Sequence, residues 1–328
     1  MEFITNEYKF KSASGLCDIY AQSAAPDDFG SVKGVVQIAH GMAEHSNRYA
    51  RFAMELCKNG YAVYINDHLG HGTSVATDDE LGFFGDNGDI ALVEDMKQLS
   101  DIAMAEYPDL PFFVFGHSMG SFLARAYAAK YGSNIDGLVL SGTAGANPAA
   151  AMGIMLANYF EKTEGKLYRS ELLDSIAFGK YNKKTAKQTK FDWLSRDEKE
   201  VKKYIDDPYC GFVFTANGFK TLFTLLKNIS SNKWYKSVPT ALQIMMISGE
   251  NDPVGEYGKG VTSVYRDLRK TGHTNTYLKL YPEARHEILN EINKDEVMAD
   301  IIMWLDDKTM PSKDDEECKT DEKTDNDI

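Results

Sequence analysis

The sequence predicts an α/β protein with a mostly parallel, doubly wound sheet that is interrupted by an inserted helical cap. Three observations lead to this class. Through the first 143 residues, short apolar runs alternate with amphipathic helical patterns. The alternation stops between about 144 and 235, and it resumes up to about 306. Because strands that alternate with helices form parallel sheets with right-handed crossovers, the segment in between is expected to be an insertion.

The apolar runs are continuous rather than alternating, which is typical of strands buried on both faces. We expect such strands at 34–41, 61–67, 111–116, 136–142, 241–249 and 276–282. The first apolar residues, 8–12 and 17–22, suggest an antiparallel hairpin at the sheet edge. Helical spacing predicts helices at 47–59, 89–106, 121–132, 257–271 and 287–306. Residues 1–143 and 236–306 are thus the predicted core, and residues 144–235 the predicted cap.

Charge and composition narrow the expected location and partners. The 328 residues carry a formal net charge of −13, which repels nucleic acid and anionic membrane surfaces. The acidic tail, 307–328, holds nine acids and four bases with almost no apolar side chain, so it is predicted to be disordered. The four cysteines are scattered, the N-terminus lacks a secretory apolar stretch, and no apolar run is long enough to span a bilayer. We expect a cytoplasmic protein.

The strongest motif is Gly116-His117-Ser118-Met119-Gly120, a G-x-S-x-G pattern between an expected strand and an expected helix. A serine on such a sharp turn projects its hydroxyl away from the sheet, and glycines on both sides avoid steric clashes. The backbone N–H of Met119 starts the helix and points where an oxyanion would form. Although the pentapeptide also occurs without chemistry, this context favours Ser118 as a nucleophile.

A serine hydroxyl needs a base and an orienting acid before it attacks a carbonyl, and in such sheets the order along the chain is Ser, acid, His. Asp252 follows the strand that is expected to end at 249, and Pro253 restricts its direction. We therefore favour Asp252 as the acid over its neighbour Glu250, which is expected to be a surface residue.

Two histidines follow Ser118 in the chain. His286 comes just after the strand expected at 276–282, at the edge where the serine lies, and is the predicted base. His273 lies at the opposite end of that strand and is expected on the surface. The second oxyanion donor is expected from the loop after the strand at 34–41, where the N–H of Met42 is the candidate.

The segments HGMAEHSNRY, DHLGHGTS and GHSMGS, with the END and RHE signals, resemble the monoacylglycerol lipase and lysophospholipase group of α/β-hydrolases. The resemblance covers nearly all of the chain outside the cap and the tail. It implies the α/β-hydrolase fold, triad roles for Ser118, Asp252 and His286, an oxyanion hole of Met42 and Met119, a cap over the acyl site, and no cofactor. Met42-Ala43 replaces the small residues that related lipases often carry, which is expected to narrow the entrance.

Several other features have competing interpretations. Five histidines could suggest a metal site, but they match no ligand spacing, so we expect hydrogen-bonded loop residues and no metal: His40, His45, His68, His71 and His117. The apolar stretch 151–160 predicts either a lipid or acyl-chain contact, with Met152 and Met155 in a pliable pocket, or a buried helix. The basic stretch 180–190 is expected to be a solvated face, with attraction of anionic head groups as the alternative. Trp193, Tyr209 and Phe212 are expected in the cap core rather than in contact with substrate.

These observations predict a serine hydrolase that cleaves a small-molecule carboxylic ester, such as a monoacylglycerol or lysophospholipid, through an acyl-enzyme on Ser118. One alternative is a serine peptidase of the proline iminopeptidase-like type, which uses the same fold and triad. Another is a non-catalytic binding module on this scaffold. Such modules usually lose a member of the triad, and here all three residues are present.

Overall fold

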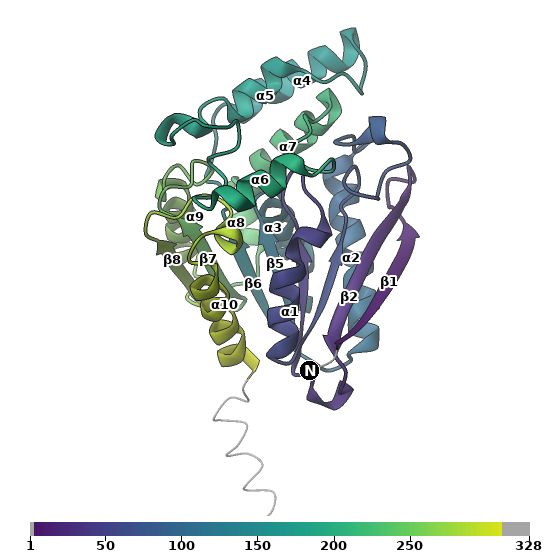
Figure 1. The fold of residues 1–328 in the computed structure, drawn as a ribbon, viewed down its shortest axis with the longest axis vertical. Coiled ribbons are helices and arrows are strands. Elements are labelled where there is room, and N and C mark those ends of the chain that lie inside the picture. The colour runs from purple at the N-terminus through teal and green to yellow at the C-terminus, as the bar shows by residue number, and fades with distance from the viewer. Residues whose placement is uncertain (1–2, 310–328) are drawn as a thin grey trace, which may run out of the picture.

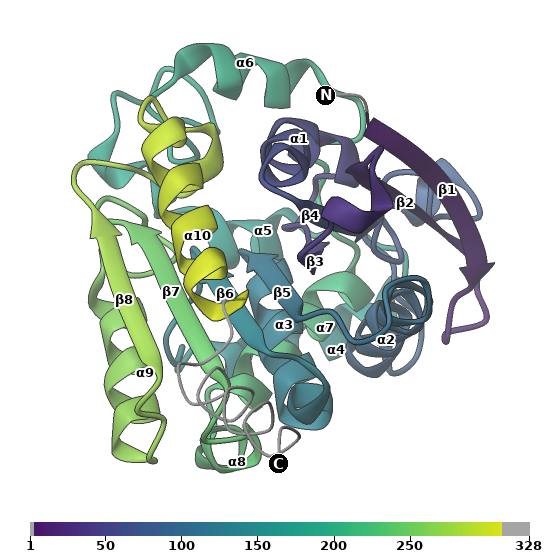
Figure 2. The same ribbon diagram turned by 90° about the horizontal axis from the view of Figure 1, so that it is seen from below.

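The computed structural model describes residues 3–309. In this part of the chain, eight strands form one sheet in the order β1-β2-β4-β3-β5-β6-β7-β8, with helices on both faces (Figures 1 and 2). The hairpin β1 (Phe3–Lys11) and β2 (Asp18–Pro26) is antiparallel, and β2 also pairs antiparallel with β4 (Tyr61–Asn66). All pairings from β4 to β8 are parallel. The predicted mostly parallel, doubly wound sheet is confirmed.

The parallel strands follow the apolar runs of the sequence to within two residues at either end. They are β3 (Gly34–Ala39), β4, β5 (Phe112–His117), β6 (Gly137–Ser141), β7 (Gln243–Gly249) and β8 (Thr276–Tyr281). Strands β3 to β6 are buried along their whole length, whereas β8 is partly exposed because it forms the edge of the sheet.

Helices cover the two faces of the sheet in separate layers (Figure 2). One face is covered by α1 (Ala50–Lys58) and α10 (Lys294–Thr309), and the other by α2 (Gly88–Glu106), α3 (Met119–Tyr131) and α9 (Lys259–Lys270). Two predicted helices begin instead with short 3-10 turns, Ser46–Tyr49 and Ile288–Asn290. Helix α10 extends three residues into the predicted acidic tail, and the rest of that tail lies outside the described residues.

Between β6 and β7 the chain leaves the sheet and forms α4 (Ala150–Thr163), α5 (Glu171–Phe178), α6 (Glu198–Asp206), α7 (Ala216–Ile229) and α8 (Asn232–Ser237). Helices α4 and α5 form the outermost layer of the molecule (Figure 1). Helix α7 packs against α4 and also against α2 and α3, and so links this outer layer to the core. In the described part of the chain, no helix is both long enough and apolar enough to cross a membrane.

The prediction that His273 lies on the surface is wrong. Its side chain is fully buried, and its ring nitrogens lie 3.1 Å from the carbonyl oxygens of Leu268 and Val238. The imidazole therefore joins the end of α9 to the segment that leads into β7. The polar residues around it suggested exposure, but the Thr271 hydroxyl also lies 3.0 Å from Nδ1, so both ring nitrogens have hydrogen-bond partners within the protein and need no contact with water.

Candidate active site

Ser118 lies on a strained turn between the end of β5 and the first residue of α3. Its φ of 52° and ψ of −120° are values that non-glycine residues seldom adopt, and such strain gathers at functional sites. The N–H of Ser118 donates to the carbonyl of Ser141 at 2.9 Å, which holds the turn against β6. A Cβ on Gly120 would lie 2.1 Å from the carbonyl oxygen of Ala39, so only glycine lets α3 begin this close to β3.

Asp252 and His286 meet in the loops that follow β7 and β8. The Asp252 Oδ2 atom lies 3.0 Å from His286 Nδ1, and both side chains are buried. The Ser248 hydroxyl donates to Oδ2 at 3.1 Å, and the N–H of Val254 donates to Oδ1 at 2.8 Å. The carboxylate is thus held in one orientation toward the imidazole, whereas the competing acid, Glu250, is exposed.

The two histidines at this site have opposite electrostatic surroundings. Burial disfavours the protonated form of His286, but the Asp252 carboxylate outweighs burial, so the pKa of His286 is raised above its usual value. Burial, reinforced by His286, holds the pKa of His117 well below its usual value. The two ring centroids are 4.7 Å apart. Of this pair, His286 is therefore the ring that is able to gain a proton near neutral pH.

This shift predicts the pH dependence of the reaction. We expect kcat/KM on a non-ionising ester to rise with pH and to level off with an apparent pKa above about 6.5, the ordinary value for histidine. His286 is the predicted base, and a base must be neutral to accept a proton from Ser118; a raised pKa of His286 keeps its protonated form present to higher pH. Initial rates between about pH 5 and 9 test this. An apparent pKa below about 6.5 would contradict the paired geometry.

A cavity of about 660 Å³ contains both Ser118 and His286 in its lining. Its walls are largely apolar side chains from the segment between β6 and β7, which we call the cap: Ile176, Phe178, Tyr181, Trp193, Phe212, Leu222, Phe223 and Leu226. Trp193 and Phe212, which were expected in the cap core, also line this cavity, whereas Tyr209 lies outside it and is 37% exposed. The presence of aromatic residues in the sequence does not show whether their side chains face the cavity or the protein core.

The loop after β3 lies against the serine. A Cβ on Gly41 would approach the Ser118 Cβ to 3.3 Å, so the glycine lets this loop come close. The N–H of Gly41 donates to Glu44 Oε1 at 2.5 Å, and Ala43 has a φ of 51°, so the loop curls tightly. Met42 in this loop lies beside the same cavity as Ser118, and its N–H stays the predicted second oxyanion donor.

The predicted partner of Met42 is Met119, which also lines the cavity. Met119 is the first residue of α3, and the N–H groups of a first helical turn have no acceptor within the helix. The positive end of the helix dipole adds to their attraction for a negatively charged oxygen. The structure thus gathers all five predicted site residues around one cavity or directly behind it, since Asp252 lies behind His286.

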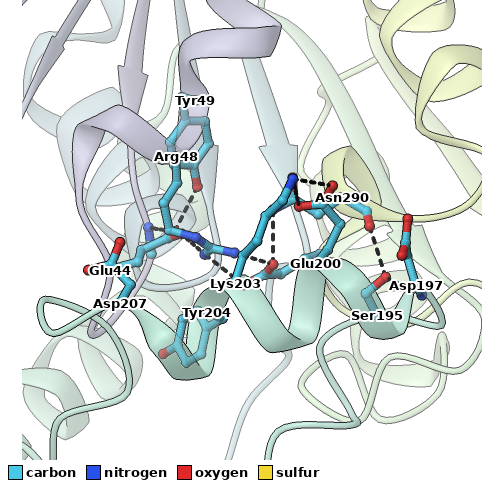
Figure 3. A network of polar contacts seen from close by, with 12 residues as sticks. Glu44, Arg48, Tyr49, Ser195, Asp197, Glu200, Lys203, Tyr204, Asp207 and Asn290 are labelled. Atoms are coloured by element: carbon cyan, nitrogen blue, oxygen red, sulfur yellow. Dashed lines mark hydrogen bonds and ion pairs between the residues drawn. The ribbon is translucent and has the colours of Figure 1, made fainter.

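A buried ion-pair network, which the sequence did not reveal, lies behind the site. Arg48 pairs with Glu44 (Figure 3) and binds Glu287 through two hydrogen bonds of 2.8 and 2.7 Å. The Tyr49 hydroxyl donates to Glu44 Oε1 at 2.8 Å. Burial raises the pKa of Glu44, whereas at Glu287 the attraction of Arg48 outweighs burial and lowers the pKa to about 2. The network joins the loop after β3 to the residue that follows His286.

The loop that carries His286 is also bound to the cap through the backbone. The N–H of His286 donates to the carbonyl of Trp193 at 3.3 Å, and the N–H of Glu287 donates to the carbonyl of Leu194 at 2.7 Å. The Arg285 guanidinium donates to the carbonyl of Ser195 at 2.9 Å. This part of the cap therefore forms part of the scaffold that positions the histidine.

Three of the other histidines form a buried cluster that is hydrogen-bonded to the backbone, as the sequence predicted. The N–H of His68 donates to His40 Nε2 at 2.9 Å, and the N–H of Ala43 donates to His71 Nε2 at 3.2 Å. Burial lowers the pKa of all three rings, to about 3 for His68 and about 4 for His71. They are neutral near pH 7, and His71 supports the loop that carries Met42.

Comparison with known proteins identifies a family and several relatives. The model of a family described as serine aminopeptidase, S33, matches residues 30–293. The monoacylglycerol lipase of Mycolicibacterium smegmatis is 27% identical over 300 residues, which covers 92% of this chain and 96% of the relative. Human monoglyceride lipase is also 27% identical, over 85% of this chain and 84% of its own length.

Solved structures agree with the sequence relatives. A thermostable carboxyl esterase from Bacillus coagulans, in complex with glycerol, has a TM-score of 0.88 and 32% identity over 93% of this chain and 99% of its own. A lipase in an open form has a TM-score of 0.85 and 28% identity over 94% and 100% of the two chains. The fold is the α/β-hydrolase fold, and the chain belongs to the serine aminopeptidase S33 family.

Proposed function

We propose that this carboxylic ester hydrolase acts on monoacylglycerols or similar single-chain acyl esters, with Ser118, Asp252 and His286 as its catalytic triad. One observation carries the proposal. The hydrogen-bonded Asp252–His286 pair adjoins a cavity with apolar walls, and Ser118 lies in the lining of that cavity on a strained turn. The relatives named monoacylglycerol or monoglyceride lipase support the substrate class.

In the proposed reaction, the Ser118 hydroxyl attacks the ester carbonyl while His286 Nε2 takes its proton. The Asp252 carboxylate holds the other ring nitrogen, Nδ1, and stabilises the imidazolium. The N–H groups of Met42 and Met119 stabilise the oxyanion. The alcohol leaves with the proton from His286, and water then attacks the acyl-enzyme by the same route in reverse, which releases the fatty acid and frees Ser118.

The family description makes aminopeptidase activity the main competing proposal. An aminopeptidase must bind the positively charged amino group of its substrate, which requires a free carboxylate near the nucleophile. The carboxylate in the loop beside Ser118 is that of Glu44, and it already accepts hydrogen bonds from the Gly41 N–H, the Tyr49 hydroxyl and Arg48. The cavity lining also contains Asp174, which pairs with Lys190, and Glu256, but most of its walls are apolar, which favours an acyl chain over a charged peptide N-terminus.

A chain-length series tests the substrate class. We expect kcat/KM on p-nitrophenyl esters from acetate to palmitate to rise about fourfold per methylene, since each buried methylene contributes about 0.8 kcal/mol, until the cavity is filled. The same series on 1-monoacylglycerols should place its optimum at medium or long chains. An optimum at acetate would indicate a small-ester esterase, and faster cleavage of an amino-acid anilide than of any ester would favour the aminopeptidase.

Helix α4 presents an apolar face to the solvent. Gly153 and Ala157 are buried on its inner side, whereas Met152, Met155 and Tyr159 are 58%, 72% and 59% exposed. The two methionines therefore face outward, and the idea that they line a pliable pocket is wrong. Leu167, in the segment between α4 and α5, and Leu172 on α5 are also exposed, at 46% and 53%. Large outward apolar patches mark interaction surfaces, and we propose that this one contacts lipid transiently.

If α4 contacts lipid, substitutions on its exposed face should weaken vesicle binding without changing the turnover of a soluble ester. The double variant Met152→Glu/Met155→Glu should bind phosphatidylcholine vesicles at least about tenfold more weakly, because burying a Met side chain contributes about 1.5–3 kcal/mol. Its rate on soluble p-nitrophenyl butyrate should stay near that of the wild type. Met303→Glu is the matched control, since Met303 is 67% exposed on α10. Equal vesicle binding by both variants would rule out the contact.

We also propose that the protein acts in the cytoplasm. Cys17, Cys57 and Cys210, the cysteines that lie within residues 3–309, are free thiols. Unpaired cysteines are typical of proteins that remain in a reducing compartment.

A further inference from the structure

His45, Asp207 and Cys210 bring a nitrogen, an oxygen and a sulfur donor together where the cap meets the core. Their ligand atoms all lie within 4.8 Å of one another. His45 directly follows the loop that carries Met42, whereas Asp207 and Cys210 directly follow α6 of the cap. Among residues 3–309, this is the one grouping of three or more such side chains with a spacing that suits a metal ion.

The two cap residues are presented by one tight turn. The N–H of Cys210 donates to the carbonyl of Asp207 at 3.0 Å, which closes the turn over Pro208 and Tyr209. Asp207 Oδ1 accepts the N–H of Tyr209 at 2.9 Å, and Oδ2 lies 2.9 Å from His45 Nε2. Two ligands separated by two residues have the spacing with which C-x2-C turns hold zinc. Here an aspartate takes the place of the first cysteine.

The charges around Cys210 favour a cation. The Asp207 carboxylate directly follows α6, and the carboxylates of Glu44 and Glu287 lie nearby, where both pair with Arg48. Three carboxylates against one guanidinium leave an excess of negative charge around the thiol. In Figure 3, Asp207 lies at the same end of α6 as Glu44 and Arg48. A divalent ion at this place would offset the excess of negative charge.

We propose that His45, Asp207 and Cys210 form a zinc site, with water as the fourth ligand. The Cys210 S–H bond breaks as the sulfur binds Zn²⁺, one proton is released to solvent, and no electrons are transferred. His45 binds through neutral Nε2 and Asp207 through its carboxylate. A thiolate combined with an imidazole selects Zn²⁺ over Mg²⁺ and Ca²⁺, which prefer oxygen ligands.

The site lies where the cap already contacts the loop that carries Met42. The N–H of Gly211 and the hydroxyl of Tyr204 already donate to the carbonyl of Ala43, at 3.0 and 2.9 Å. A zinc ion would add bonds between the same cap turn and His45, three residues after Met42. Zinc is therefore expected to fix this edge of the cap to the loop that supplies the oxyanion donor.

Calorimetry on the full-length chain tests the site. We titrate ZnCl2 into wild type and into Ser118→Ala, and repeat the titration in buffers of different ionisation enthalpy. We expect one zinc per chain and one proton released per zinc in both proteins. Co²⁺ should give the charge-transfer absorption of a cobalt–thiolate bond, and excess Mg²⁺ should not displace it. Because Ser118→Ala removes catalysis and leaves the three ligands, its titration separates this proposal from the proposed function.

Variants then assign the ligands. Cys210→Ser and His45→Gln should each weaken zinc binding at least about tenfold, and Cys210→Ser should abolish the cobalt–thiolate absorption. Cys17→Ser and Cys318→Ser, which remove other thiols, should bind zinc as the wild type does. Equal binding by wild type, Cys210→Ser and His45→Gln would overturn the site, and so would loss of binding in Cys318→Ser alone. Thermal unfolding without zinc, in which each variant should retain a cooperative transition, confirms that the variants are folded.

Discussion

Replacing Ser118 with alanine is expected to lower kcat on every ester by roughly 10⁴- to 10⁶-fold, while the melting temperature stays close to that of the wild type. The loss is large because the acyl-enzyme has no other nucleophile, and His286 then has no hydroxyl to activate. Residual turnover would come from the oxyanion donors and from substrate binding alone. Steady-state rates on p-nitrophenyl esters measure the effect, and a fluorophosphonate probe that acylates active serines should label only proteins that retain Ser118.

Ser121 offers a matched control for this substitution. It lies one helical turn further along α3, and its hydroxyl donates to the carbonyl of Ser118 at 2.6 Å. Ser121→Ala should lose less than about tenfold in kcat, because it removes only a neutral hydrogen bond of about 1 kcal/mol. A Ser118→Ala protein that remained fully active or still reacted with the probe would disprove the assignment of the nucleophile.

The second large effect is expected from Asp252→Asn, which should lower kcat by about 10⁴-fold. The amide has nearly the shape of the carboxylate, but it presents no negative charge to the imidazolium. It also favours the wrong tautomer of His286, because an amide N–H in place of Oδ2 would face Nδ1. Since Asp252 is the group that raises the pKa of His286, the apparent pKa of any remaining activity should fall.

Glu250→Gln is the control for this second prediction, because Glu250 is two residues away, has a similar carboxylate and is exposed. It should keep nearly the full rate and an unchanged pH profile. Measuring both variants across the same pH range decides between the two acids. A slow Glu250→Gln protein beside an active Asp252→Asn protein would reverse the assignment.

The sequence predicted the strands and the positions of the site residues for one physical reason. The ends of parallel strands meet at one edge of the sheet, so residues just after β5, β7 and β8 gather without any knowledge of side-chain contacts. Ser118, Asp252 and His286 are such residues. The motif around Ser118 added the sharp turn, whose steric requirements are local and visible in the glycines.

What the sequence did not predict depends on contacts between distant segments. The pairing of Arg48 with Glu287 joins residues 239 positions apart, and that of His45 with Asp207 joins residues 162 apart. The i, i+4 spacing of Glu44 and Arg48 is compatible with an ion pair, but the sequence does not indicate that Glu287 also binds Arg48. Likewise, Trp193 and Phe212 reach the cavity because of how the cap folds back, which local periodicity does not encode.

The backbone bonds between residues 193–194 and the loop of His286 limit how this protein can be modified. Because the cap supplies most of the apolar wall of the cavity, exchanging it between relatives is an obvious way to change substrate preference. Here, a chimera that replaced the whole insertion would also remove the carbonyls that support the histidine. A productive exchange should therefore retain residues 192–196 from the recipient and graft only α4, α5 and the segments around them. In a library of chimeras between relatives, the active members should be those that keep residues 192–196 and the His286 loop from the same parent.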